Sequence, residues 1–264
     1  MSRIVFHHVG RSFTRGGTTV EALSGIDLEI RDREFVAIVG PSGCGKTTLM
    51  RMVAGLEFPT TGSVRVDDRE ITEPGPDRAV VFQAFALFPW KTVEANIGFG
   101  LRCKGVAEAE RAKIVQRYIG LMGLSGYEQA YPHQLSGGMQ QRVAIARSYA
   151  LDPGVLLMDE PFGALDAQTR VVMQEELVKL ARAQPRTVLF ITHAVEEAVY
   201  LADRVVVMSR RPGRIREIVQ VGNVRREERW EDLQHIEEVM DTASFVHLRT
   251  HIWKLLREQH LEAA

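Results

Sequence analysis

The chain has 264 residues, of which 45% are hydrophobic and 25% charged, and its formal net charge is −1. This composition is that of a globular protein with one large domain, or a core with a smaller insert. A nearly neutral chain lacks the positive field of a nucleic-acid binder, so no nucleic-acid partner is expected. Two cysteines, Cys44 and Cys103, are too few for a disulfide framework and fit a reducing compartment.

Neither export nor insertion into a membrane is expected from the apolar pattern. The N-terminus has no apolar signal core. The longest apolar runs, such as 35–39 and 155–158, have the length of strands and fall far short of the roughly 20 apolar residues that span a bilayer. A chain of this kind that works at a membrane needs a partner to hold it there.

The first third of the chain reads as strands with one helix. Residues 34–39 form an apolar run that ends at Gly40, which is typical of a strand buried on both faces. Residues 46–56 carry apolar side chains at helical spacing. Shorter apolar or alternating segments predict further strands at 4–9, 23–30, 62–66 and 79–82.

Helical patterns follow from about residue 92, with helices predicted at 106–122 and 137–150. After residue 150 strands and helices alternate, which implies a parallel sheet covered by helices. The alternating segments are 155–158, 166–182, 187–191, 194–201 and 204–208. The simplest organisation is a helical insert between two α/β blocks.

The tail from about Arg225 is polar and helical, with apolar residues near one face. We expect an amphipathic hairpin folded back on the core; a regulatory or docking role is the alternative. The apolar residues of this face are Trp230, Leu233, Ile236, Met240, Phe245, Leu248, Ile252 and Leu255.

A glycine-rich loop between the buried strand and the following helix fits the pattern G-x-x-x-x-G-K-[ST] at every fixed position. Glycines let the backbone wrap phosphates with its N–H groups, and the helix N-terminus directs its positive end at them. Lys46 is expected to bind the β- and γ-phosphates, and Thr47 to offer its hydroxyl to Mg²⁺. The predicted nucleotide-binding set is Gly40, Pro41, Ser42, Gly43, Cys44, Gly45, Lys46, Thr47 and Thr48. Because Cys44 lies inside this loop, a thiol reagent is expected to block activity that depends on the nucleotide, with protection by the nucleotide.

A second group of candidate site residues follows the apolar strand predicted at 155–158. Asp159 and Glu160 follow it directly, at the carboxyl end of a strand, where ligands of α/β sheets collect. Asp159 is expected to hold Mg²⁺, and Glu160 to polarise the attacking water as a general base.

Residues 135–142, Leu-Ser-Gly-Gly-Met-Gln-Gln-Arg, resemble the signature sequence of ATP-binding-cassette (ABC) ATPases. The resemblance covers about residues 3–222 and implies a glutamine that contacts Mg²⁺ and the water at Gln83, a D-loop aspartate at Asp166 and a switch histidine at His193. It also places Phe13 where the family stacks an aromatic ring on adenine; a core position is the alternative for this residue. The implied catalytic residues are Glu160, His193 and Gln83, and the implied metal ligands Thr47, Gln83 and Asp159.

The signature also implies a dimer. Ser136, Gly137 and Gly138 open a helix and so form a second anion site. In the family that site serves the ATP held by the other subunit of a head-to-tail pair. The implied assembly is thus a homodimer that sandwiches ATP and Mg²⁺ between its subunits.

The family resemblance predicts the fold class as well: an α/β P-loop NTPase core with a mixed, mainly parallel sheet, an antiparallel β subdomain and an inserted helical subdomain. We predict an ATPase domain at 1–224, with the helical subdomain at about 88–150. A C-terminal helical extension is predicted at 225–264.

The segment 88–90, Phe-Pro-Trp, and the short tail resemble the ATPases of nitrate, sulfonate, taurine and bicarbonate importers. This implies a peripheral subunit at the cytoplasmic face of the bacterial inner membrane. A transmembrane permease would dock on the apolar region 83–93, and a periplasmic or lipid-anchored binding protein would deliver the solute. Importers of glycine betaine or a thiamine precursor are alternatives, as is a soluble ABC ATPase outside transport.

Overall fold

The computed structural model describes residues 2–233 and 235–261, with the backbone alone for residue 15 and residues 259–261. The chain divides into two compact units. The first unit comprises Met1–Gly75 and Ala183–Ala264, and the second comprises Pro76–Arg182. Among the described residues, every helix is too short or too polar to cross a lipid bilayer.

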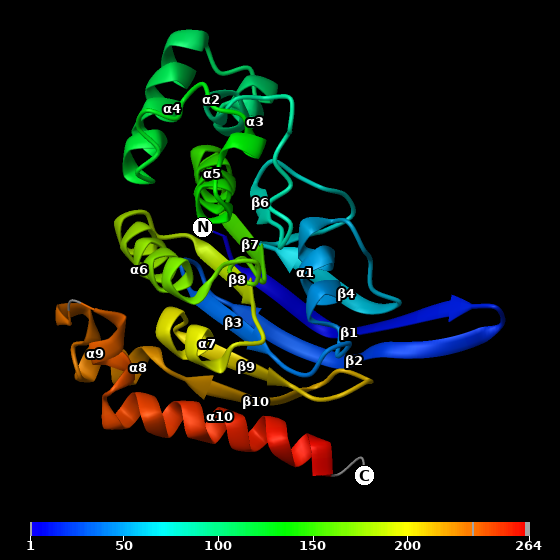
Figure 1. Ribbon diagram of the computed structural model, residues 1–264. Helices are drawn as coiled ribbons and strands as arrows, with labels where there is room; N and C mark the ends of the chain where they lie inside the picture. The colour runs from blue at the N-terminus through cyan, green and yellow to red at the C-terminus, as the bar shows by residue number, and fades with distance from the viewer. Residues whose placement is uncertain (1, 234, 262–264) are drawn as a thin grey trace. The chain divides into compact units, whose positions relative to one another are not determined.

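The first unit contains an antiparallel sheet with the strand order β2-β1-β4-β5. Its long hairpin closes at Gly16 and Gly17, which both have positive φ (57° and 81°), as a two-residue turn between Arg15 and Thr18 requires. Figure 1 shows this hairpin in blue. The strands are β1 (Ile4–Arg15), β2 (Thr18–Ile30), β4 (Thr61–Val66) and β5 (Arg69–Glu70).

The other sheet strands of the first unit lie in the order β10-β9-β3-β8. Strand β3 pairs in parallel with both β8 and β9, whereas β10 is antiparallel to β9. Every residue of β3 and β8 is buried, as the continuous apolar run of β3 predicts. The strands are β3 (Phe35–Val39), β8 (Thr187–Ile191), β9 (Arg204–Met208) and β10 (Ile215–Gln220).

Helices of the first unit include α1 (Lys46–Ala54), which follows β3, and α7 (Val195–Leu201), which follows β8. The C-terminal segment then forms a run of helices, of which α10 packs against α7 and β9. Figure 1 shows α10 alongside these elements in red. The run consists of α8 (Gly222–Glu227), a 3₁₀ turn (Trp230–Asp232), α9 (Ile236–Met240) and α10 (Ala243–Leu261).

The amphipathic face predicted for the tail is confirmed. Trp230, Ile236, Phe245 and Ile252 are buried. The other four residues of that face are half-buried: Leu233, Met240, Leu248 and Leu255. Hydrophobic burial thus holds the C-terminal segment on the first unit.

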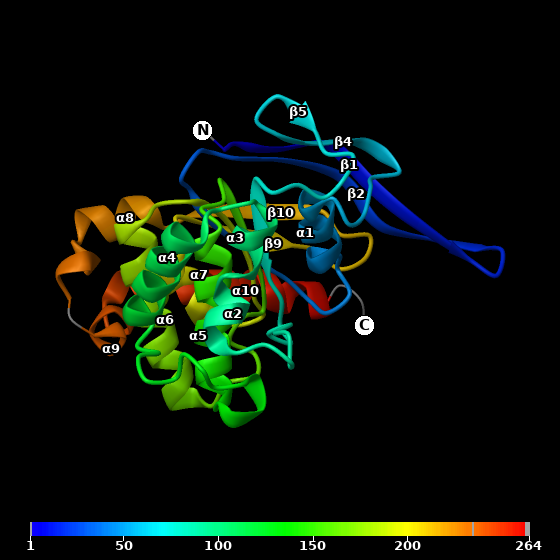
Figure 2. The same ribbon diagram turned by 90° about the horizontal axis from the view of Figure 1, so that it is seen from above.

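The second unit pairs two parallel strands, β6 (Arg78–Val81) and β7 (Val155–Asp159). A group of mutually packed helices belongs to the same unit, and Figure 2 shows it from above. The helices of this unit are α2 (Val93–Ile97), α3 (Phe99–Cys103), α4 (Glu108–Leu121), a 3₁₀ turn (Pro132–Gln134), α5 (Gly137–Ala150) and α6 (Ala167–Ala183).

The predicted mixed α/β fold is confirmed, with parallel strands, an antiparallel β part and a helical group. Four local features were not predicted: strands β5 and β10, the outer half of the β1–β2 hairpin, and the short helices α2 and α3. The outer hairpin is polar and exposed, so it carries little of the apolar alternation that identifies a strand in sequence.

Candidate nucleotide site

The phosphate loop connects the end of β3 to the start of α1. Gly43 and Gly45 have positive φ, 76° and 98°, which an L side chain rarely adopts. A Cβ atom on Gly45 would also come within 2.4 Å of Cδ2 of Leu23. The glycine at this position is therefore required both by its backbone conformation and by its neighbour.

Lys46 is 8% exposed and turns back into the loop. Its Nζ donates hydrogen bonds to the carbonyl oxygens of Gly40, at 2.7 Å, and Pro41, at 3.1 Å. The first turn of α1 has no acidic residue and no side-chain cap, and Thr47 and Thr48 lie there half-buried. A buried ammonium beside an uncapped helix N-terminus is an arrangement that binds anions.

Cys44 is almost completely buried, with 1% of its surface exposed. Burial raises the pKa of its thiol above the ordinary value, while the neighbouring Lys46 acts in the opposite direction. The thiol is therefore less accessible and less ionised than a loop position suggests. The expected reaction with thiol reagents must accordingly be slow.

His193 lies at the same edge of the sheet as the phosphate loop. Strands β3 and β8 run in parallel with Ile38 beside Ile191, and the backbone N–H of Thr192 donates to the carbonyl of Ile38 at 3.3 Å. The hydroxyl of Thr192 donates to Glu197 at 2.6 Å and accepts from the N–H of Ala194 at 3.0 Å. These bonds fix the turn that presents the exposed His193.

Phe13 lies on β1 opposite Val20 and is 40% exposed. The guanidinium of Arg11 sits 4.6 Å from the centroid of its ring. The ring is thus partly open on the surface rather than in the core, and its stacking on adenine stays a prediction.

In the second unit, the carboxyl ends of β6 and β7 bring Gln83 to Glu160. The strands pair in parallel with Val81 beside Met158, so both residues leave the same edge. The Gln83 side-chain Nε2 donates to Oε2 of Glu160 at 3.3 Å. Asp159 is the last residue of β7, and Glu160 has a positive φ of 45°.

The predicted signature residues form the start of α5. Ser136 is the N-cap, and its hydroxyl accepts from the N–H of Met139 at 3.4 Å. Gly137 is exposed, whereas Gly138 is buried: a Cβ atom on Gly138 would come within 2.5 Å of Cγ2 of Thr169. This close approach explains why the position needs glycine.

Asp166 lies at the start of α6 and is bonded to the same Thr169. The carboxylate accepts from the N–H of Thr169 at 3.0 Å and from its hydroxyl at 2.7 Å. Both hydrogen bonds lower the pKa of Asp166, and the bond from the backbone N–H has the larger effect. Thr169 thus joins the predicted D-loop residue to Gly138, a link that spacing in the sequence does not reveal.

Sequence reasoning also missed Arg147, which lies on α5. Its Nη1 donates to the carbonyl of Ala86 at 2.8 Å and its Nη2 to that of Phe85 at 3.2 Å. Phe85 and Ala86 both have positive φ (54° and 48°), and burial lowers the pKa of Arg147. Arg147 therefore holds a strained turn of the segment that follows Gln83.

The segment expected to meet a permease has mixed exposure. Trp90 is 71% exposed. Phe85 and Phe88 are half-buried, and Phe88 packs on Phe99 with ring centroids 4.5 Å apart. The expected exposed aromatic surface is therefore carried mainly by Trp90.

The predicted site residues divide between the two units. The first unit holds Phe13, residues 40–48 and His193; the second holds Gln83, Ser136–Gly138, Asp159, Glu160 and Asp166. The first set fits a nucleotide phosphate, through Lys46 and the glycine cradle. The oxygen donors Thr47, Gln83 and Asp159 are of the kind that Mg²⁺ prefers.

The comparisons with known proteins agree with this chemistry. A family model described as ABC transporter matches residues 23–163. The chain belongs to the ABC transporter family, and it is an ATPase that hydrolyses ATP.

Among similar proteins, an uncharacterized ABC transporter ATP-binding protein of Methanocaldococcus jannaschii is 54% identical over 219 residues, which is 83% of this chain and 82% of that protein. The nitrate import ATP-binding protein NrtD of Synechocystis is 51% identical over 207 residues, 78% of each chain. The bicarbonate transport ATP-binding protein CmpC of Synechococcus elongatus is 44% identical over 260 residues, 97% of this chain and 38% of that protein.

Among solved structures, the fold matches the ATP-binding cassette MJ0796, in a dimeric post-hydrolysis state bound to ADP and phosphate. The TM-score is 0.73 at 31% identity, and the match covers 83% of this chain and 98% of that one. The fold is therefore that of an ABC cassette.

Proposed function

We propose that this chain is the ATP-hydrolysing subunit of an importer for a small anion such as nitrate, a sulfonate, taurine or bicarbonate. The observation that carries the proposal is the 51% identity to a nitrate import ATP-binding protein over 78% of both chains. The 44% identity to a bicarbonate transport protein points to the same group of solutes.

The proposed chemistry is hydrolysis of the terminal phosphate bond. Lys46 and the loop N–H groups hold the β- and γ-phosphates, and Mg²⁺ held by Thr47, Asp159 and Gln83 would neutralise phosphate charge. Glu160 accepts a proton as the water oxygen bonds to the γ-phosphorus and the bond to ADP breaks. His193 contacts the γ-phosphate and helps to hold the water.

The proposed assembly is a head-to-tail homodimer in which each ATP also meets Ser136–Gly138 of the other chain. The dimeric state of the MJ0796 structure supports this arrangement. Phe13 would stack on the adenine, and Asp166 would lie near the nucleotide of the pair. ATP then joins the two chains, and hydrolysis releases them.

The remaining proposed partners are a transmembrane permease and a substrate-binding protein outside the membrane. The permease would dock at 83–93, where Trp90 is exposed. The chain would then work as a peripheral subunit on the cytoplasmic face of the membrane. We infer the domain limits 1–224, with a helical subdomain at about 88–150, and 225–264 for the extension.

The test is growth of a deletion strain on nitrate as nitrogen source, on taurine or another sulfonate as sulfur source, and at low bicarbonate. The parent gene should restore growth on one of these, and a Lys46→Ala gene should not. Growth of the deletion strain on all of them, with a defect on glycine betaine or a thiamine precursor instead, would overturn the anion proposal.

The importer itself is tested by purification from membranes. The chain should elute with a permease and be present in two copies per complex. Recovery with ribosomes or DNA alone would contradict the transport role and favour a soluble ABC ATPase.

A further inference from the structure

We propose that Arg225 of the C-terminal extension is a positioning residue for ATP hydrolysis. It acts by fixing the start of β3 and helix α7, which follows His193. The inference rests on the proposed role of His193, which precedes α7. It assigns a function to a segment outside the 23–163 range that the family model matches.

Arg225 lies on α8 and reaches the C-terminal end of α7. Its Nη2 donates to the carbonyl oxygens of Tyr200, at 2.9 Å, and Ala202, at 2.7 Å. The last carbonyls of a helix have no partner within the helix, and a cation there is favoured by the helix dipole. Arg225 therefore completes the end of α7 that lies opposite His193.

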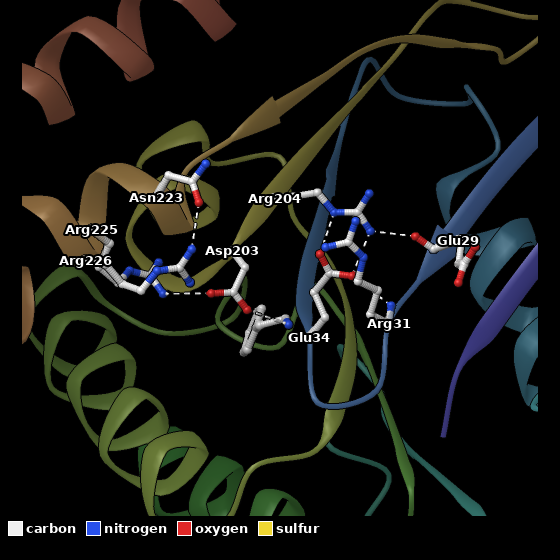
Figure 3. A network of polar contacts seen from close by, with 9 residues as sticks. Glu29, Arg31, Glu34, Asp203, Arg204, Asn223, Arg225 and Arg226 are labelled. Atoms are coloured by element: carbon white, nitrogen blue, oxygen red, sulfur yellow. Dashed lines mark hydrogen bonds and ion pairs between the residues drawn. The ribbon is translucent and has the colours of Figure 1, made fainter. Parts of the chain in front are cut away.

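The same guanidinium pairs with Asp203, at 3.6 Å between Nη1 and Oδ1, as Figure 3 shows. Asp203 joins three segments. Its Oδ2 accepts from the N–H of Phe35 at 2.9 Å, and its own N–H donates to the carbonyl of Phe35 at 2.7 Å. Its carbonyl accepts from the N–H groups of Val221, at 2.9 Å, and Gly222, at 2.8 Å.

Phe35 begins β3, the strand that ends at the phosphate loop. A second ion pair ties this corner: Arg204 donates to both carboxylate oxygens of Glu34, at 2.6 and 2.8 Å, with both side chains largely buried (13% and 11% exposed). Arg225 thus acts on the start of β3 and on the end of α7. The phosphate loop directly follows β3, and His193 lies just before α7; both are proposed to contact phosphate.

The other end of α7 is fixed as well, by the bonds of Thr192 to Glu197 and Ala194. These bonds connect α7 to the turn that carries His193, and a closely packed interior transmits a displacement from one side of an element to the other. A shift at the Arg225 end is therefore expected to reach His193.

The extension holds Arg225 in place through its own packing. Phe245 and Ile252 of α10 are fully buried, and the rings of Trp230 and Phe245 lie 5.8 Å apart. Glu228, three residues after Arg225, accepts hydrogen bonds from Trp230 Nε1 and from the hydroxyl of Ser244. Trp253 Nε1 also donates to Glu196 of α7, at 3.4 Å.

The chain offers a matched control one residue further on. Arg226 is also on α8, but its Nη2 donates to Asn223 of the same helix, at 2.6 Å, and Figure 3 shows this bond beside that of Arg225. Arg226→Ala removes the same charge and side chain as Arg225→Ala and leaves α7 and Asp203 untouched.

The experiment compares full-length Arg225→Ala, Arg225→Lys and Arg226→Ala with the parent. It measures kcat, nucleotide Kd and stoichiometry, thermal unfolding, and the ring C–H NMR signal of His193, assigned with His193→Gln. We expect Arg225→Ala to lower kcat about tenfold or more with full binding at parent Kd, and to shift the His193 signal. The kcat of Arg225→Lys should lie between those of Arg225→Ala and the parent, because one ammonium group cannot replace the planar guanidinium. The kcat of Arg226→Ala should equal that of the parent.

Three results would overturn the inference. The first is a kcat of Arg225→Ala equal to that of the parent. The second is an equal loss of kcat in Arg226→Ala. The third is a loss of kcat in both Arg225 variants that is fully explained by a lower stoichiometry of nucleotide binding. A lowered kcat with an unmoved His193 signal would also exclude the route through α7. If Arg225→Ala fails to fold, the same criteria apply to Arg225→Lys. The proposed hydrolytic chemistry is tested by a different variant: it would be wrong if Glu160→Gln hydrolysed ATP at the parent rate.

Discussion

The side-chain amide of Gln83 donates a hydrogen bond to the carboxylate of Glu160, at 3.3 Å between Nε2 and Oε2. The two residues are 77 positions apart in the chain, and the parallel pairing of β6 with β7 brings them together. A Cβ atom on Gly163 would lie 3.4 Å from the same Nε2. Gln83 thus contacts the carboxylate of Glu160 and helps to orient it.

Replacement of Glu160 by glutamine tests its role as the general base. The amide keeps the size of the side chain but cannot accept the proton of the water, so kcat should fall about a hundredfold or more. ATP binding should persist, and the protein should collect as a dimer with ATP, seen by size-exclusion chromatography. The control is Glu176→Gln, at a half-buried position of α6 where the carboxylate pairs with Lys179. Hydrolysis at the parent rate by Glu160→Gln would refute the assignment.

Replacement of Ser136 by arginine tests the site shared between two chains. Ser136 is exposed at the start of α5, so a large side chain there leaves the fold intact but blocks the approach of a second chain. We expect unchanged nucleotide binding by the monomer and no hydrolysis at any protein concentration. Fluorescence titration and a phosphate-release assay measure the two quantities, and hydrolysis as in the parent would rule out the composite site.

Replacement of Arg147 by methionine tests the link between α5 and the turn after Gln83. Methionine fills similar space but leaves the carbonyls of Phe85 and Ala86 without their charged donor. The free energy of unfolding should fall by about 1–3 kcal/mol, measured by urea denaturation. Arg117→Met, at an exposed position of α4, should change it little, and equal stability of Arg147→Met and the parent would show that the bonds contribute nothing.

Labelling of the two cysteines tests the burial of the phosphate loop. Cys103 is exposed and Cys44 is buried, so a maleimide should modify Cys103 first, as mass spectrometry of peptides would show. Burial raises the pKa of the Cys44 thiol, so a smaller fraction of it is thiolate at a given pH than for an ordinary cysteine. Its labelling should therefore accelerate as pH rises, and ATP should slow it. Equal rates for both residues at neutral pH would contradict the burial of the loop.

Local sequence patterns were enough to place most of the proposed site residues at the ends of their strands and helices. The phosphate loop, the Asp159–Glu160 pair and the signature at 135–142 each consist of neighbouring residues, and each lies at the end of a strand or start of a helix as predicted. The spacing of apolar residues and the composition also predicted α4, α5 and the buried face of the tail, because the side of an element that is buried must be apolar.

Only the tertiary structure decided which distant residues support that chemistry. Thr169 bonds to Asp166 and touches Gly138, Arg147 holds two carbonyls 61 and 62 positions away, and Arg225 joins α7 to Asp203. The bonds of Arg147 and those of Arg225 to α7 end on backbone carbonyls, and Thr169 meets a glycine; every residue offers the same backbone groups. The sequence therefore carries no mark of the partner, and the folded path of the chain selects it.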